Sequence, residues 1–186
     1  MQNINELIGI IKGIDFDGVI NDKEVLRLQS WVEKNRNLAY DKQQMELIKM
    51  VDSVLEDHVI EKELLIIACE EFLKHSGDSS SRIYELNGII EGIVCDGEVN
   101  EAEVWRLKEW MDTYGDSIRD YKPSSELCKT IDDIIEDGVV TEEEQSYLLK
   151  MLNFRIKNAQ FETKLAYLCK LVKERRNIGV DLIDIL

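Results

Sequence analysis

Three turns along the chain combine acidic, glycine and amide or hydroxyl residues at a spacing that suits cation binding. Each has the pattern Asp-Gly-x-aliphatic-Asn/Thr-x-x-Glu, and the copies begin at Asp17, Asp96 and Asp137. With glycine as the sixth position of a calcium-binding loop, the aliphatic residue falls at position eight and the glutamate at position twelve, as such a loop requires. The candidate ligands for calcium or another divalent cation are Asp15, Asp17, Asn21, Glu24, Asp96, Asn100, Glu103, Asp137, Thr141 and Glu144.

The early positions of these loops are poor in oxygen ligands. Position one falls on Gly13 in the first turn and on Gly92 in the second, and position three falls on Val94 in the second turn and Ile135 in the third. A calcium ion binds about six to eight oxygen atoms, so the second and third loops supply too few. The first turn keeps the most oxygen-bearing side chains and is the best candidate for a cation.

The same residues also have a purely structural interpretation. Glycine can adopt the left-handed conformation that ends one helix, and Asn21, Asn100 or Thr141 can cap the start of the next helix. A glutamate three residues after the cap can accept a hydrogen bond from the backbone N–H of the cap residue, which forms a capping box. The sequence favours this interpretation, and we expect the Asp-Gly turns to be chiefly structural.

The first two turns belong to a longer internal repeat. Residues 7–14 have the pattern Leu-x-x-Ile-Ile-x-Gly-Ile, which returns at residues 86–93, and Trp31 matches Trp110 at the same offset of 79 residues. A second block, Glu-Leu-x-Lys, occurs once in each copy, at residues 46–49 and 126–129. The chain is therefore predicted to be a tandem duplication of a unit with two helical hairpins.

Apolar residues recur at helical spacing along the chain, and no stretch alternates convincingly with a period of two. Helices are predicted over residues 3–15, 21–35, 43–56, 60–75, 81–94, 100–114, 124–136, 141–153 and 160–176. We therefore predict an all-α helical bundle built from two pseudo-symmetric four-helix repeats plus a C-terminal helix. The expected boundaries are 1–77 for the first repeat, 81–154 for the second, and 155–186 for the C-terminal helix and apolar tail, with a polar loop at residues 77–81.

Charge and cysteine usage exclude several classes of partner and location. The formal net charge is −15, which repels a phosphate backbone at long range, so we expect no nucleic-acid partner. The four cysteines are widely spaced and form no Cys-x-x-Cys pair, which favours reduced thiols. Neither a signal peptide nor an apolar run of about 18 to 20 residues is evident, so we expect a cytoplasmic protein without membrane insertion.

Patterns typical of enzyme sites are missing from the sequence. The two histidines, His58 and His75, are not spaced as a metal-binding pair on one helical turn, and no cysteine has a neighbouring histidine. Glycine-rich phosphate loops and the Gly-x-Ser-x-Gly nucleophile motif are also absent. We therefore expect a non-enzymatic protein that binds a protein partner or assembles with copies of itself.

Two regions are candidates for partner binding. Trp105 stands where the first copy has Leu26, between core-facing neighbours on its predicted helix. Burial is the favoured interpretation of this tryptophan, and an exposed binding anchor is the alternative. The tail is too apolar to prefer water, so we expect it to pack on the body or on another molecule. Its candidate contact residues are Leu182, Ile183, Ile185 and Leu186.

Helical hairpins joined by a recurring Asp-Gly-x-aliphatic-x-x-x-Glu turn resemble the TerB-like domains associated with bacterial tellurite resistance and stress response. The resemblance covers most of residues 1–153 through the three turns. It implies an all-helical bundle with clustered acidic residues that binds metal or serves as an interaction module. The acidic positions that correspond are Asp17, Glu24, Asp96, Glu103, Asp137 and Glu144.

Overall fold

The computed structural model describes residues 4–36, 42–56, 79–118 and 122–158. Within these ranges the secondary structure is helical and includes no strand, which confirms the all-α class for the described part of the chain. The helices predicted over 60–75 and 160–176 lie outside the described residues. The same is true of Leu182, Ile183, Ile185 and Leu186.

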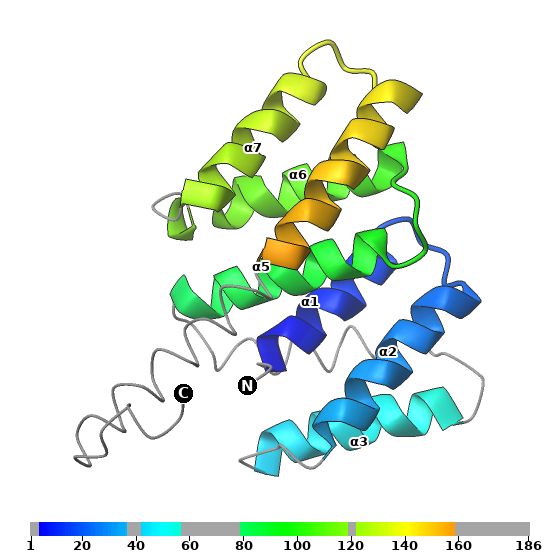
Figure 1. The fold of residues 1–186 in the computed structure, drawn as a ribbon. Coiled ribbons are helices and arrows are strands. Elements are labelled where there is room, and N and C mark those ends of the chain that lie inside the picture. The colour runs from blue at the N-terminus through cyan, green and yellow to red at the C-terminus, as the bar shows by residue number, and fades with distance from the viewer. Residues whose placement is uncertain (1–3, 37–41, 57–78, 119–121, 159–186) are drawn as a thin grey trace, which may run out of the picture.

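Short turns join α1 to α2, α5 to α6, and α7 to the helix that follows it (Figure 1). They are α1 (Ile4–Asp15), α2 (Asp22–Asn35), α3 (Lys42–Glu56), α5 (Ser79–Val94), α6 (Glu101–Tyr114), the short 3-10 helix η1 (Gly115–Ser117), α7 (Lys122–Ile134) and a helix over residues 142–158. The described helices α1, α2, α3, α5, α6 and α7 begin and end within two residues of the predicted bounds. Helical periodicity and cap residues therefore predict these elements well.

Two helix boundaries differ from the prediction for local reasons. The helix over 142–158 continues beyond the predicted end at residue 153, because no glycine or proline stops it and Ile156 packs against the hydrophobic core. Arg155 also donates a hydrogen bond to the carbonyl of Pro123 at 2.7 Å, which ties the added turn to α7. In addition, α5 begins at Ser79, so the polar stretch expected as a loop supplies the start of a helix, where serine is favoured.

The helices α1 and α5 pack against each other along their glycine faces. Each carries two glycines four residues apart, Gly9 and Gly13 in α1 and Gly88 and Gly92 in α5. A Cβ atom built on Gly88 would lie 2.0 Å from the backbone oxygen of Glu6 and 2.9 Å from the Cα of Gly9. No residue other than glycine fits at such a separation, so the glycines set how closely the two backbones approach.

The register of this contact makes the two helices parallel. Gly88 lies against Gly9, and Gly92 lies against Gly13, so residue numbers increase in the same direction along both helices. The contact is also reciprocal: a Cβ on Gly9 would lie 2.0 Å from the backbone oxygen of Glu85. Since Gly88 faces Glu6 in the same way, residues 79 positions apart make equivalent contacts.

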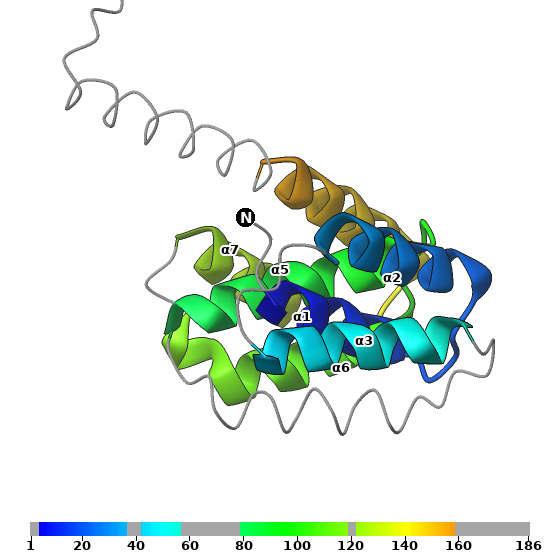
Figure 2. The ribbon, with the colours of Figure 1, turned by 90° about the horizontal axis from the view of Figure 1, so that it is seen from below.

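Buried apolar side chains form two clusters on either side of this helix pair. One contains residues from 4 to 55, with Trp31 at 1% exposed, and the other contains residues from 86 to 152, with Trp110 at 6% exposed. In Figure 2, α1 and α5 lie in the middle, α2 and the helix over 142–158 lie above them, and α3 and α6 lie below. The pair therefore holds both clusters together and fixes the positions of the turns at its ends.

Candidate functional site

The three Asp-Gly turns have one shared backbone geometry. Their glycines, Gly18, Gly97 and Gly138, have φ angles of 82°, 92° and 80°. The N–H of each glycine donates a hydrogen bond to the carbonyl three residues earlier, over 3.0 to 3.1 Å. The aspartate before each glycine accepts a hydrogen bond from the N–H two residues ahead, over 2.9 to 3.0 Å. The left-handed glycines predicted from the sequence are therefore confirmed.

The capping boxes predicted after these turns are also present. The Asn21 side chain accepts a hydrogen bond from the N–H of Glu24 at 3.2 Å, and the N–H of Asn21 donates to Glu24 Oε2 at 2.6 Å. Asn100 and Glu103 form the same pair of bonds at 3.0 and 2.8 Å. Thr141 donates its N–H to the third glutamate at 2.8 Å. These glutamates thus stabilise the first turn of the helix that follows.

The first two turns meet at one end of the α1–α5 pair. Because the two helices are parallel, their C-terminal ends lie side by side (Figure 1). The Asn100 side chain donates a hydrogen bond across the contact to Asp17 Oδ2 at 3.5 Å, and Lys23 Nζ donates to the backbone oxygen of Asp96 at 2.5 Å. The structure therefore brings Asp17, Asn21, Glu24, Asp96, Asn100 and Glu103 to one region, which the sequence alone did not predict.

Burial makes two carboxyl groups in this region hard to ionise. Glu24 is 2% exposed and Glu103 is 4% exposed. Desolvation raises the pKa of Glu24 to about 7, the hydrogen bond from the Asn21 N–H opposes the shift, and Asp17 and Asp96 add to it. Desolvation likewise raises the pKa of Glu103 to about 8, and the nearby carboxylates add to the shift. Both glutamates therefore change protonation near neutral pH.

The ligand geometry expected of a cation site is not assembled in the described ranges. No group of three or more His, Cys, Asp or Glu side chains there is arranged to hold a metal ion. One oxygen of Glu24 and one of Glu103 already accept cap N–H bonds. Asp15, another of the candidate ligands, is partly buried at the end of α1. Divalent-cation binding by these residues stays a prediction.

The third turn stands apart from the other two. It joins α7 to the helix over 142–158 at the top of Figure 1. Asp137 and Thr141 are exposed, and Glu144 is partly buried. The three turns therefore share a local structure, while only two of them contribute to the acidic region.

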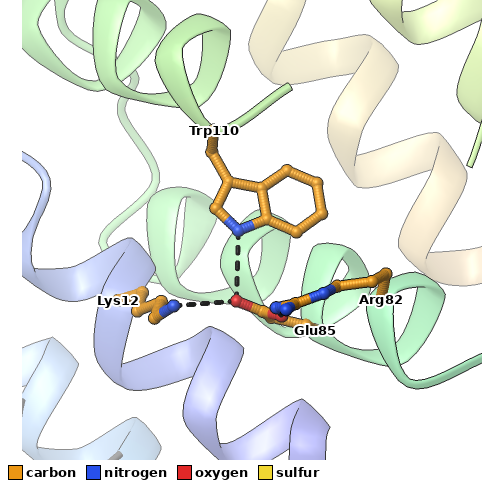
Figure 3. A network of polar contacts seen from close by, with 4 residues as sticks. All are labelled: Lys12, Arg82, Glu85 and Trp110. Atoms are coloured by element: carbon orange, nitrogen blue, oxygen red, sulfur yellow. Dashed lines mark hydrogen bonds and ion pairs between the residues drawn. The ribbon is translucent and has the colours of Figure 1, made fainter. Parts of the chain in front are cut away.

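A buried ion network lies beside the glycine contact (Figure 3). Glu85 of α5 is 0% exposed and accepts hydrogen bonds from Lys12 Nζ at 2.9 Å, from Arg82 at 2.5 Å and from Trp110 Nε1 at 3.1 Å. The guanidinium of Arg82 also lies 4.1 Å from the ring centroid of Tyr114. Paired on three sides, this carboxylate ties α1, α5 and α6 together, and we assign it a structural role.

The three tryptophans differ in their surroundings. Trp31 and Trp110, which match in the internal repeat, are both buried, but the Trp31 Nε1 has no hydrogen-bond partner among the residues that the structure describes. Trp105 is 36% exposed, and its Nε1 donates to Glu101 at 3.4 Å. The burial that the sequence favours for Trp105 is therefore wrong, because the side chain is exposed. Whether it anchors a partner stays a prediction.

A groove of about 450 Å³ lies between α2, the end of α5 and the helix over 142–158. It is lined by Lys23, Leu26, Arg27, Lys34, Glu91, Val94, Cys95, Asn153 and Ile156. Leu26, at the position equivalent to Trp105, is 62% exposed. The groove thus combines the exposed side chain of Leu26 and three further apolar side chains with charged and polar groups.

The groove has the opposite charge to the rest of the protein. Lys23, Arg27 and Lys34 supply three cationic groups, whereas Glu91, which forms an ion pair with Arg27, is the single carboxylate among its lining residues. The chain as a whole carries −15. This local excess of positive charge favours an anionic ligand segment.

Cys95 lies in the wall of the groove but is poorly suited to nucleophilic chemistry. Desolvation raises the pKa of its thiol to about 12, and Glu24 and Asp96 add to the shift. At neutral pH the thiol is therefore protonated, and a protonated thiol is a weak nucleophile.

Comparisons with family models, with curated proteins and with solved structures found no match to this chain. The described helices include none that is both long and apolar enough to cross a membrane. Sequence reasoning did not identify the groove, because its walls come from α2, α5 and a helix more than a hundred residues beyond α2. The one local sign of the groove is the exposed aliphatic side chain of Leu26.

Proposed function

We propose that this protein is a non-enzymatic, TerB-like protein-interaction module that acts in the bacterial cytoplasm in a stress or defence response. The observation that carries the proposal is the groove between α2 and the helix over 142–158, where exposed Leu26 lies beside three cationic groups. A protein segment with aliphatic and acidic side chains matches both properties of this surface.

The module is best explained as two repeats of one helical unit related by a pseudo-two-fold axis. The reciprocal contacts of Gly9 and Gly88, and the identical capping boxes at Asn21 and Asn100, support this interpretation. The two-fold symmetry does not extend to the side chains of the groove, because Leu26 in the first repeat corresponds to Trp105 in the second. The two repeats thus share a scaffold while presenting different surfaces.

Peptide selection on the full chain tests the interaction proposal. A displayed library of random twelve-residue peptides is panned against the wild-type protein and against a Leu26→Glu/Lys34→Glu variant. Both side chains are exposed, so the variant is expected to fold. We expect the wild type alone to enrich peptides that combine Asp or Glu with aliphatic residues. Absence of enrichment, or the same enrichment on the variant, contradicts the proposal.

The alternative function is binding of calcium or another divalent cation at the first two acidic turns. It is supported by the approach of Asp17 and Asp96 to Glu24 and Glu103: burial is the main cause of the raised pKa values of the two glutamates, and the charges of Asp17 and Asp96 raise them further. A cation placed there would relieve this repulsion. Calorimetric titration with calcium, magnesium and zinc, repeated on Asp17→Asn, distinguishes this function from protein binding.

A further inference from the structure

We infer that the groove between α2 and the helix over 142–158 binds residues 180–186 of the same chain, so that this segment competes with an external partner. The inference rests on the proposed function, because it assumes that the groove binds a protein segment. It goes further by naming the occupant. Residues 180–186 lie outside the described residues, and their sequence is Val-Asp-Leu-Ile-Asp-Ile-Leu.

The chemistry of this segment matches that of the groove. It contains two aspartates and five aliphatic residues and has no cation. The groove offers Leu26, Val94 and Ile156 for apolar contacts, and Lys23 and Lys34 for the carboxylates. Two acidic groups and a run of aliphatic side chains thus meet a cationic, apolar surface on a protein that is otherwise strongly acidic.

The position of the segment in the chain favours binding within one molecule. Asn153 and Ile156, which line the groove, lie in the last turns of the described helix, and residues 159–179 connect that helix to the segment. A helix over residues 160–176, as the sequence predicts, spans about 26 Å at about 1.5 Å per residue, and the residues after it reach back to the groove at about 3.3 to 3.6 Å per extended residue. A tethered segment acts at an effective concentration of about millimolar, well above that of a second copy.

The test measures binding of a fluorescein-labelled peptide with the sequence of residues 178–186 to full-length proteins by fluorescence anisotropy. In Asp181→Lys/Asp184→Lys the tethered segment no longer matches the charge of the groove. We expect this variant to bind the peptide about tenfold more tightly than the wild type, because its groove is no longer occupied. Adding Leu26→Glu and Lys34→Glu to it should abolish binding, whereas adding Val139→Glu, an exposed position outside the groove, should not.

Equal peptide affinity for the wild type and the Asp181→Lys/Asp184→Lys variant overturns the inference. Binding that survives the Leu26→Glu/Lys34→Glu change overturns it as well. A wild-type dimer that is lost in Asp181→Lys/Asp184→Lys assigns the segment to a second copy and also overturns the intramolecular form. If library peptides bind the groove while the 178–186 peptide does not, this inference fails and the proposed function stands. If neither binds, both fail.

Discussion

Replacing Gly88 by alanine should strongly destabilise the protein, because the new methyl group would collide with the backbone of α1. The Cβ position lies 2.0 Å from the Glu6 oxygen, and ordinary contacts begin at 3.4 Å, so the helices must separate by about 1.4 Å. Overpacking of this kind costs about 1 to 3 kcal/mol, and the loosened apolar contacts on both sides add to it. Alanine recovers about 1 kcal/mol through helix propensity, which leaves a net loss of about 2 kcal/mol.

Urea unfolding followed by far-UV circular dichroism measures this loss. Ser146→Ala, an exposed position in the helix over 142–158, is the control and should change stability by less than about 0.5 kcal/mol. The double variant Gly9→Ala/Gly88→Ala should lose less than the sum of the single losses, since the first substitution already separates the backbones. A Gly88→Ala protein as stable as the wild type would refute the close packing of α1 on α5.

Three further predictions concern the tryptophans, the buried glutamates and the cation. Trp110→Phe removes a hydrogen bond to the buried carboxylate of Glu85 and should cost about 1 to 3 kcal/mol more than Trp31→Phe, because no described residue accepts a hydrogen bond from the Trp31 indole N–H. Equal losses in urea unfolding would contradict this. Folding raises the pKa of Glu24 from 4.5 to about 7 and that of Glu103 from 4.5 to about 8, so the folded state binds more protons than the unfolded state. The two glutamates therefore contribute their full stabilisation below pH 4.5, and this contribution is lost as the pH rises to about 8. Urea midpoints from pH 5 to 9 should fall less steeply in Glu103→Gln than in the wild type, and parallel pH profiles would exclude this residue as the cause. Calcium below about millimolar should not raise the melting temperature, whereas a micromolar shift that Asp17→Asn abolishes would favour cation binding over a structural role for the turns.

Local features of the fold are well predicted from the sequence because their causes are local. The left-handed glycines and capping boxes depend on residues within one turn, and the pattern at Asn21 to Glu24 specifies both partners of each hydrogen bond. The end of the last described helix was less predictable. No stop signal marks residue 153, and packing of Ile156 on the core extends the helix to 158.

Features that join distant segments could not be predicted in the same way. The repeat identified Gly13 and Gly92 as equivalent, but equivalence in sequence does not indicate that the two helices touch. Their parallel contact is also what brings the first two acidic turns together. The groove has the same origin, since Leu26 and Ile156 belong to helices far apart in the sequence and line one groove only once the chain is folded.

The most direct test of the central claim, that this groove is the partner-binding surface, is the amide spectrum of the uniformly ¹⁵N-labelled chain titrated with a peptide selected on it. We predict that the largest shift changes fall on residues that line the groove, including Leu26, Lys34, Val94 and Ile156. Shift changes centred instead on the exposed face around Trp105, or spread without a common surface, would contradict the assignment of the groove as the binding site.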